Sequence, residues 1–405
     1  MSKKEVIYDE ALVPSYQLPS LLGKSDGSSA ATAGEWLSTR RPEILAIYRE
    51  RVFGKWLHRP QIQWYETLSV REDALDGEAI RKEIRIHLGS AEGKTHSFDM
   101  LLYIPKTATP EHPVPVFIGL NFRGNHATTD ERDVAMTGFG YEKNQYLNDE
   151  SRGNSVPRWC FRETIRRGYA SATICYHDIC PDYNDLSCFR QSVLSILGST
   201  DDLSLVHRNY TAIGLWAWGL SRGLDCLESE VLVDSSRCAV HGLSRLGKTS
   251  LWAGANDERF KLVISTDSGC GGAALFKRCF GETAEIISTA FPHWFVEAFA
   301  QYRGREDLMD FDQHFLLSLI APRALCVASA TEDLWADPLG EFLAAKHAGD
   351  AYRLFGLSGI ESDDMPAADE WLTGDVSYHL RTGKHDQTPE DWAHYWVLAD
   401  RIFQK

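Results

Sequence analysis

The sequence of 405 residues contains no run of 18 or more apolar residues, so we expect no membrane-spanning helix. It is also short of positive charge: 42 Lys and Arg residues stand against 57 Asp and Glu residues, a formal net charge of -15. A surface this acidic repels phosphate backbones, which argues against a nucleic-acid partner. Internal repeats and low-complexity tracts are absent, and an apolar content of 43% is typical of a folded globular protein.

The nine cysteines are scattered singly, with no C-x-x-C pair and no spacing with histidine that is typical of zinc sites. Isolated cysteines in an odd number predict reduced thiols and no metal centre. The N-terminal residues are basic but no apolar segment follows them, so the chain shows no signal peptide and predicts a cytoplasmic protein. A secreted or periplasmic protein whose signal had been removed is the alternative.

Short apolar runs separated by helical or loop stretches dominate the chain. Runs without alternation are typical of parallel strands that are buried on both faces, and their alternation with helices predicts right-handed βαβ units. The sequence therefore predicts an α/β fold, in which a mostly parallel central sheet carries helices on both faces as a three-layer sandwich. The expected strands are Lys82–Leu88, Asp99–Ile104, Pro115–Leu120, Tyr169–Cys175, Cys238–His241, Lys261–Ser265, Ala324–Ser329, Ala351–Phe355 and Val376–Leu380.

We expect one catalytic domain over residues 1–405, with an N-terminal helical lead-in over 1–75 and a core over 80–405. Apolar residues near helical spacing predict a helix over Glu35–Trp56 in the lead-in. Long gaps between the expected strands predict two loop insertions, near 121–168 and 356–375.

Residues 237–255, RCAVHGLSRLGKTSLWAGA, carry the motif that points to chemistry. A short apolar strand runs into a turn and then into a helix, which is the arrangement of a nucleophile elbow. Gly242 leaves room for the sharp turn, Ser244 is placed to expose its hydroxyl, and the helix N-terminus behind it offers N–H groups to an oxyanion. The motif departs from Gly-x-Ser-x-Gly by one position, because Leu246 precedes Gly247. A serine that only caps the helix is the alternative.

The same residues match the phosphate-loop pattern Gly-x-x-x-x-Gly-Lys-Thr, so a nucleotide-hydrolysing protein with Lys248 and Thr249 at the phosphates is a competing interpretation. Leu243 and Leu246 are bulky at positions where backbone must approach phosphate. A phosphate loop also normally follows the first strand of its sheet, whereas this motif lies in mid-chain. These two features favour the nucleophile elbow over the phosphate loop.

A nucleophilic serine needs a histidine base and an acid that orients the base. On an α/β-hydrolase sheet they follow in the order Ser, acid, His. Two acids come after expected strands: Asp267 in STDSGCGG and Asp333 in ATEDLWADP. His385 in RTGKHD is the expected base because loop-forming residues surround it, and His379 and His347 are its rivals.

These motifs resemble the glucuronoyl esterases, carbohydrate esterase family fifteen, and especially their bacterial members. The family motif Gly-x-Ser-Arg-x-Gly-Lys matches Gly242, Ser244, Arg245, Gly247 and Lys248, and the likeness spans roughly residues 80–405. The resemblance implies an α/β-hydrolase fold with no metal and no organic cofactor. It also implies a two-step acyl-enzyme reaction on the ester that joins 4-O-methyl-glucuronic acid of glucuronoxylan to lignin-type alcohols.

The resemblance also implies a role for each matched residue. Ser244 is the nucleophile, His385 is the base, and Arg245 supports the oxyanion. The triad acid is Asp333 or Asp267. The family's usual acid is a glutamate at the position of Asp267, one methylene longer, whereas some bacterial relatives carry the acid at the position of Asp333. We favour Asp333 for this reason.

Three further residues, Lys248, Glu282 and Trp335, match the family's sugar contacts and imply a glucuronate ester or a glucuronoxylan-derived oligosaccharide as the partner. An acetyl xylan esterase on the same fold and a non-catalytic carbohydrate-binding relative remain as alternatives; intact Ser244 and His385 argue against the second. The family mostly works on polymers outside the cytoplasm, which conflicts with the missing signal peptide. The sequence predicts no oligomeric state.

Overall fold

The computed structural model describes residues 6–139, 145–198 and 200–404. The chain forms two compact units, each assembled from several segments. Unit 1 comprises Met1–Lys55, Gly242–Glu258 and Leu262–Asp386, and unit 2 comprises Trp56–His241, Arg259–Lys261 and Gln387–Lys405. Every residue that the sequence analysis assigns to chemistry therefore lies in unit 1. The single-domain organisation, with its lead-in and core, stays a prediction.

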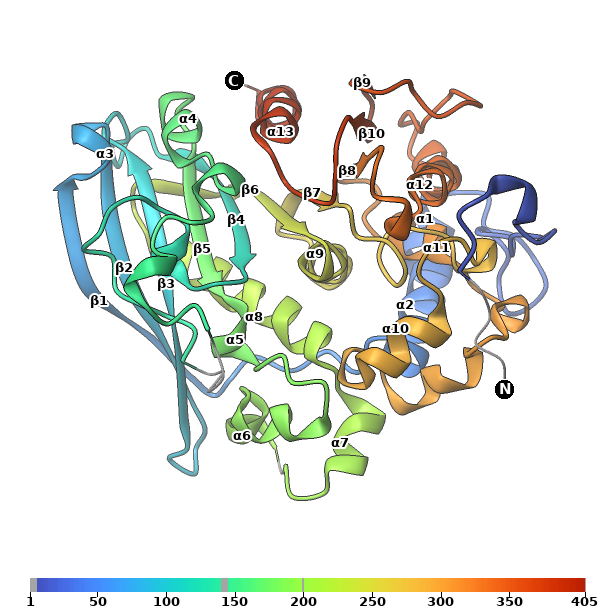
Figure 1. The fold of residues 1–405 in the computed structure, drawn as a ribbon, viewed down its shortest axis with the longest axis horizontal. Coiled ribbons are helices and arrows are strands. Elements are labelled where there is room, and N and C mark those ends of the chain that lie inside the picture. The colour runs from blue at the N-terminus through green and yellow to red at the C-terminus, as the bar shows by residue number, and fades with distance from the viewer. Residues whose placement is uncertain (1–5, 140–144, 199, 405) are drawn as a thin grey trace. The chain divides into compact units, whose positions relative to one another are not determined.

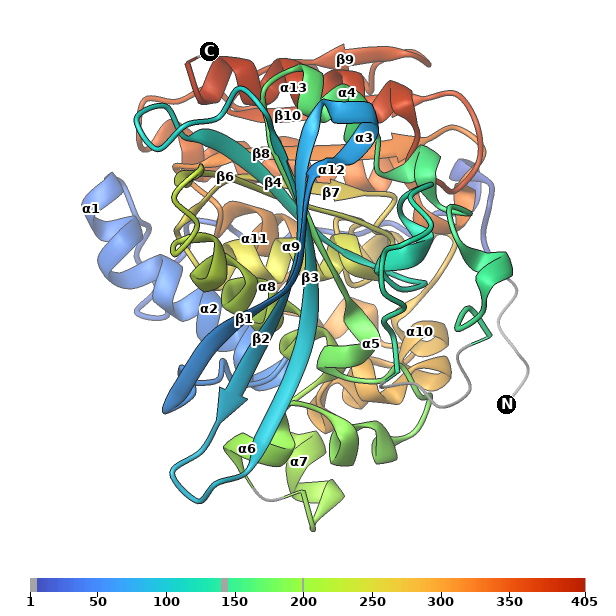
Figure 2. The ribbon, with the colours of Figure 1, turned by 90° about the vertical axis from the view of Figure 1, so that its left-hand side faces the viewer.

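Unit 2 holds the strands in the order β1-β2-β3-β5-β4-β6. The first three strands pair antiparallel and stand side by side in Figure 2, whereas β5, β4 and β6 run parallel. The strands are β1 (Ile62–Asp73), β2 (Ala79–Gly89), β3 (Thr95–Pro105), β4 (Val114–Asn121), β5 (Ala170–Cys175) and β6 (Val233–Leu243), whose last two residues belong to unit 1.

Helices cover both faces of the unit 2 strands. Neighbouring residues of a strand point to opposite faces, and Phe117 and Ile118 of β4 show what lies on each. Ile118 faces α8 (Ala212–Leu227) so closely that a Cβ on Gly223 would lie 2.9 Å from its Cδ1. Phe117 packs instead against Trp392 of α13 (Pro389–Ile402), with the ring centroids 5.4 Å apart.

The other helices of unit 2 are short. The α-helices are α3 (Ala74–Gly77), α4 (Phe161–Arg166), α5 (Tyr176–Ile179), α6 (Leu194–Leu197) and α7 (Leu203–Asn209). Its 3-10 helices are Asn125–Ala127, Asp149–Ser151, Val156–Arg158 and Leu186–Gln191. Residues 140–144 of the loop insertion expected near 121–168 lie outside the described residues.

Unit 1 holds four strands in the order β7-β8-β10-β9 (Figure 1). The β7-β8 and β8-β10 pairs are parallel and the β10-β9 pair is antiparallel. The strands are β7 (Phe260–Thr266), β8 (Ala324–Ala330), β9 (Glu370–Leu372) and β10 (Val376–Arg381). Its helices are α1 (Ala33–Glu35), a π-helix (Trp36–Arg40), α2 (Arg41–Arg51), α9 (Arg245–Asn256), α10 (Ala284–Ala290), α11 (Gln313–Ser318) and α12 (Pro338–Arg353). Its 3-10 helices are Glu10–Leu12, Phe276–Arg278, Pro292–Trp294, Glu297–Tyr302, Glu306–Leu308 and Leu334–Ala336.

Two helices of unit 1 pack on one face of its strands. Gly254 of α9 approaches Val263 of β7, where a Cβ would lie 2.5 Å from the valine Cγ2. On α12, Phe342 packs against Tyr378 of β10, with ring centroids 5.3 Å apart. The strand register places Val263 and Tyr378 on the same face. The α9 and α12 helices therefore cover the same face of these strands.

Most of the expected elements are confirmed, and eight of the nine expected strands exist within one to five residues of their bounds. The strand expected at Ala351–Phe355 is wrong, because Ala351 and Tyr352 lie in the last turn of α12 and are buried on its inner side. A short apolar run cannot distinguish a strand from a buried helix turn by periodicity alone. The helix expected at Glu35–Trp56 ends at Arg51. The edge strand β1 was not predicted, since its residues are mostly exposed.

None of the described helices is long and apolar enough to cross a membrane. All nine cysteines carry free thiols, and eight of them are buried.

Candidate active site

Ser244 occupies a strained turn between β6 and α9. Its backbone has φ 60° and ψ -128°, a conformation that costs a non-glycine residue about 1–3 kcal/mol. The Ser244 N–H donates to the carbonyl of Thr266 at 2.8 Å, and its own carbonyl accepts from the N–H groups of Gly247 and Lys248 at 2.8 and 3.1 Å. These hydrogen bonds hold the turn at the carboxyl end of β7 and leave the serine half-buried.

The turn requires a glycine two residues before the serine. A Cβ on Gly242 would lie 2.1 Å from the Leu246 carbonyl oxygen and 2.4 Å from its carbon, which are backbone atoms that cannot rotate away. The nucleophile-elbow geometry expected from the sequence is therefore present. The nucleotide-binding alternative does not fit, because α9 already begins at Arg245, so residues 245–248 are helical and form no phosphate loop.

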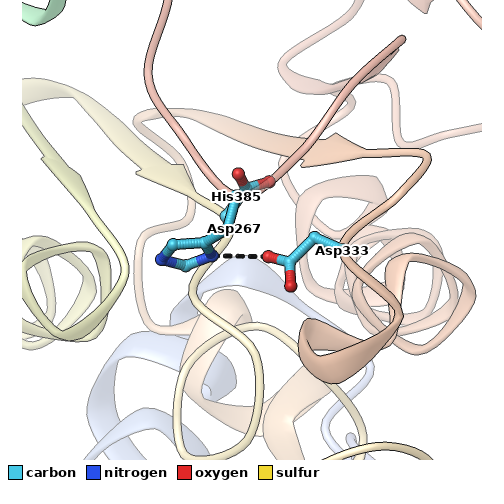
Figure 3. Close-up of side chains that lie close together, drawn as sticks. All are labelled: Asp267, Asp333 and His385. Atoms are coloured by element: carbon cyan, nitrogen blue, oxygen red, sulfur yellow. Dashed lines mark hydrogen bonds and ion pairs between the residues drawn. The ribbon is translucent and has the colours of Figure 1, made fainter.

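His385 lies against Asp333. The His385 Nδ1 and Asp333 Oδ2 atoms are 2.5 Å apart, and the opposite ring nitrogen faces away from Asp333 (Figure 3). Asp333 is buried, whereas the His385 side chain is 43% exposed. A buried carboxylate on one ring nitrogen fixes the tautomer and the ring orientation, which leaves the other nitrogen able to take up a proton.

Asp267 contacts the loop of His385. Its Oδ2 accepts the N–H of Asp386 at 3.1 Å and lies 3.5 Å from the guanidinium of Arg381. The structure thus brings both candidate acids to His385: Asp333 to the ring and Asp267 to the adjoining backbone.

Arg381, which the sequence analysis did not single out, braces the same loop. It is buried at the end of β10, and its guanidinium donates to three loop carbonyls at 2.9 to 3.2 Å, those of Thr382, Lys384 and Asp386. Its position four residues before His385, at the end of a predicted strand, was the available signal.

One cluster among the described residues has the ligand types of a metal site. Asp267, Asp333 and His385 offer ligand atoms that all lie within 4.8 Å of one another. These atoms already serve the hydrogen bonds of the His385 loop, so the arrangement accounts for their closeness without an ion. The expectation of no metal stays a prediction.

Arg245 packs against a pair of aromatic rings. Its guanidinium carbon lies 4.7 Å from the ring centroid of Trp294 and 5.5 Å from that of Phe291, and the two rings stack with centroids 3.9 Å apart. A cation held over aromatic rings gains about 1–2 kcal/mol and loses freedom of movement. The rings therefore fix the guanidinium beside the serine turn, a contact that sequence spacing does not reveal.

Lys248, Glu282 and Trp335, the residues expected to contact the sugar, lie close to one another. Lys248 is buried and its ammonium donates to the carbonyl of Ser268. Burial lowers the pKa of Lys248 and raises the pKa of Glu282, and the attraction between the two groups opposes both shifts. Trp335, which is 41% exposed, hydrogen bonds to the Glu282 side chain, and its carbonyl accepts the Glu282 N–H at 3.1 Å.

Glu341 of α12 is a fully buried carboxylate that the sequence analysis missed. It accepts the N–H groups of Ser268 and Gly269 at 2.8 and 2.9 Å, and the hydroxyl of Ser329 at 2.6 Å. Burial raises its pKa to about 7, and the nearby charge of Asp333 adds to the rise. The wrong strand prediction at Ala351–Phe355 concealed the helix that carries it.

The chain is similar to a known protein family and to several known proteins, some of them with solved structures. A family model for glucuronyl esterases of fungi matches residues 202–356. The carbohydrate esterase MZ0003, from an unknown prokaryotic organism, is 42% identical over 402 residues, which cover 97% of this chain and 91% of the relative. The structure of the glucuronoyl esterase from Solibacter usitatus matches with a TM-score of 0.90 at 40% identity, over 98% of this chain and 100% of that one. The 4-O-methyl-glucuronoyl methylesterase of Schizophyllum commune is 26% identical over 349 residues, 82% of this chain and 72% of the relative.

We expect Gly242→Ala to destabilise the protein by about 2 kcal/mol or more, because the new methyl group meets fixed backbone. The measurement is urea denaturation followed by circular dichroism. Gly34→Ala is the matched control, since the nearest atom to its added Cβ is 3.9 Å away. Equal stability of the two variants would contradict the close approach at the turn.

We expect the stability of the wild type to fall relative to Glu341→Gln between pH 5 and pH 8. The native carboxyl keeps its proton up to a pKa of about 7, whereas the unfolded chain releases it near 4.5, so rising pH favours unfolding. The difference in the free energy of unfolding should move by about 2–3 kcal/mol in favour of the glutamine variant. The measurement is urea denaturation of both proteins at pH 5 and pH 8, with Glu92→Gln at an exposed position as the control. If the difference in the free energy of unfolding between wild type and Glu341→Gln does not change with pH, the raised pKa is contradicted.

Proposed function

We propose that this chain, which belongs to the glucuronoyl esterase family (carbohydrate esterase family 15), hydrolyses the ester between 4-O-methyl-glucuronic acid and a lignin-type alcohol. Membership of the family makes the chain a carboxylic ester hydrolase with an α/β-hydrolase fold. The resemblance of its motifs to this family and the predicted fold are both confirmed.

The observation that carries the proposal is the hydrogen bond between His385 and Asp333, in the same unit as a strained serine turn. A serine on such a turn, a histidine oriented by a buried carboxylate and a helix N-terminus are the parts that acyl transfer needs. Ser244, His385 and Asp333 would be the nucleophile, the base and the acid.

The reaction then runs in two steps. Ser244 Oγ attacks the ester carbonyl while His385 accepts its proton, and the N–H of Arg245 at the start of α9 stabilises the oxyanion. The imidazolium next protonates the leaving alcohol, which leaves a glucuronoyl group on Ser244. A water molecule, deprotonated by His385, attacks this acyl-enzyme and releases glucuronate and the free serine.

The acyl group would be recognised by Lys248, Glu282 and Trp335. A buried ammonium and a half-buried carboxylate can donate to and accept from the hydroxyl groups of a uronic acid ring, and an exposed indole can cover a sugar face. An acetyl group offers nothing for these side chains to bind, so they favour the uronate ester over acetyl xylan.

The two acids, Asp333 and Asp267, would have different roles. Asp333 contacts the imidazole itself, whereas Asp267 contacts the backbone of the loop and the guanidinium of Arg381. We propose Asp333 as the triad acid and Asp267 as a positioning residue. The cytoplasmic location stays a prediction from the sequence.

We expect the wild type to release glucuronate from benzyl glucuronate, and Ser244→Ala to lose this activity by a factor of about 10⁴ or more, as for loss of other serine nucleophiles. Initial rates are measured beside an acetylated xylo-oligosaccharide, with the melting temperature of each protein as the control for folding. Release of acetate alone would move the substrate to acetyl xylan; release of neither product would remove the support for the triad.

We expect Asp333→Asn to lower kcat far more than Asp267→Asn. Replacing the triad acid by its amide leaves the histidine in the wrong tautomer and lowers kcat by about 10⁴ in a well-studied serine protease. Asp267→Asn keeps an oxygen that can accept the Asp386 N–H, so its loss should stay within about 10-fold. The measurement is kcat on benzyl glucuronate. The reverse order of the two losses would assign the triad acid to Asp267.

A further inference from the structure

Glu341 occupies the interior of unit 1 next to the site but outside the proposed triad. It belongs to the first turn of α12 and accepts hydrogen bonds from two strand-end segments, Ser268–Gly269 after β7 and Ser329 in β8. A buried carboxylate with this many donors costs free energy to remove from water, which its raised pKa reflects. The hydrogen bonds of Glu341 must offset this cost, so we ask which part of the structure they hold in place.

One peptide unit links Glu341 to Lys248. The peptide bond between Ser268 and Gly269 carries both the Ser268 carbonyl and the Gly269 N–H. The carbonyl accepts the Lys248 ammonium, and the N–H donates to Glu341 Oε1 at 2.9 Å. Because a trans peptide is planar, with its C=O and N–H pointing in opposite directions, holding the N–H also sets the direction of the carbonyl. Glu341 and Lys248 therefore clamp the same peptide dipole from opposite ends.

Other hydrogen bonds hold the groups on either side of this peptide: the Gly269 carbonyl accepts from the N–H groups of Gly272 and Ala274 at 2.8 and 3.1 Å, and the Ser268 hydroxyl accepts the Ala273 N–H at 2.8 Å. Gly269 has φ 56°, in the left-handed region, and the sequence SGCGG supplies three glycines within five residues. A glycine-rich segment has many accessible backbone conformations, so the Ser268–Gly269 peptide can rotate unless partners hold it. The Ser268 N–H and hydroxyl also donate to Glu341 Oε1, at 2.8 and 3.1 Å. Glu341 Oε1 thus gathers three donors from two residues.

We propose that Glu341 is a positioning residue for uronate recognition, which orients the Ser268–Gly269 peptide so that its carbonyl holds the Lys248 ammonium in place. The proposal rests on the function proposed above, in which Lys248 contacts the acyl group. The proposed role of Glu341 differs from that of the triad, because loss of Glu341 weakens binding of the uronate and leaves the chemical step unchanged.

The test is the kinetics of Glu341→Leu and Glu341→Gln on benzyl glucuronate, with free glucuronate as a competitive inhibitor. In Glu341→Leu the KM and the inhibition constant of glucuronate should both rise about 10-fold or more, with kcat within about 3-fold of the wild type, the effect of losing a charge-assisted contact. Glu341→Gln should restore both constants, because its amide oxygen can accept the same backbone N–H groups and its NH₂ can donate to Ser329.

Two variants complete the set. Ser329→Ala removes the hydroxyl bond to Glu341 Oε2 but leaves the peptide clamp, so its KM should stay at the wild-type value. Glu341→Asp has a side chain one methylene shorter that cannot reach both segments, so it should also raise KM. It serves as the test variant if Glu341→Leu fails to fold.

Several outcomes overturn the proposal. A fall in kcat with unchanged KM and inhibition constant in Glu341→Leu would show that Glu341 acts on the triad, and a glutamine variant as impaired as the leucine variant would show that its charge matters and not its acceptors. Lys248→Met separates this proposal from the proposed function. If Lys248→Met raises the inhibition constant of glucuronate and Glu341→Leu does not, only the role of Glu341 fails; if Lys248→Met has no effect, uronate binding by Lys248 fails with it.

Discussion

The close approach of Gly242 to the carbonyl of Leu246 is the contact on which the site depends. It lets the backbone turn from β6 into α9 within one residue, and that residue, Ser244, takes a conformation that an ordinary side chain avoids. The neighbouring elements absorb the strain through the hydrogen bond to Thr266 and the first hydrogen bonds of α9. The Ser244 hydroxyl is thereby fixed at the N-terminus of α9, at a position that the backbone itself defines.

The second constraint is electrostatic. Four carboxylates, those of Asp267, Glu282, Asp333 and Glu341, are buried or half-buried in one unit of an acidic protein. Each has a partner that offsets the loss of water: Arg381, Lys248 with Trp335, His385, and a set of backbone and hydroxyl donors. Because buried charges are stable only when they are paired or hydrogen-bonded, these contacts fix the loops after β7, β8 and β10 relative to one another. Rigidity of the loops follows from the charges that they carry.

Local patterns in the sequence were sufficient for the parts of the structure that depend on neighbouring residues. The elbow at Ser244 and the strands before Asp267, Asp333 and His385 could be predicted, since a glycine, a short apolar run and a turn signal lie next to each other along the chain. The contacts of Arg245 with Trp294 and of Glu341 with Ser268 could not. They join residues 49 and 73 positions apart, which no periodicity encodes. The strand wrongly expected at Ala351–Phe355 shows the same limit, because a buried helix turn and a buried strand have the same composition.

The two acids beside His385 stand at the ends of adjacent parallel strands, with their ligand atoms and that of the histidine within 4.8 Å of one another. Two strand ends therefore place negative charge beside one imidazole. A substitution of either aspartate alone still leaves a carboxylate next to the ring, so the local electrostatics of His385 do not depend on a single side chain.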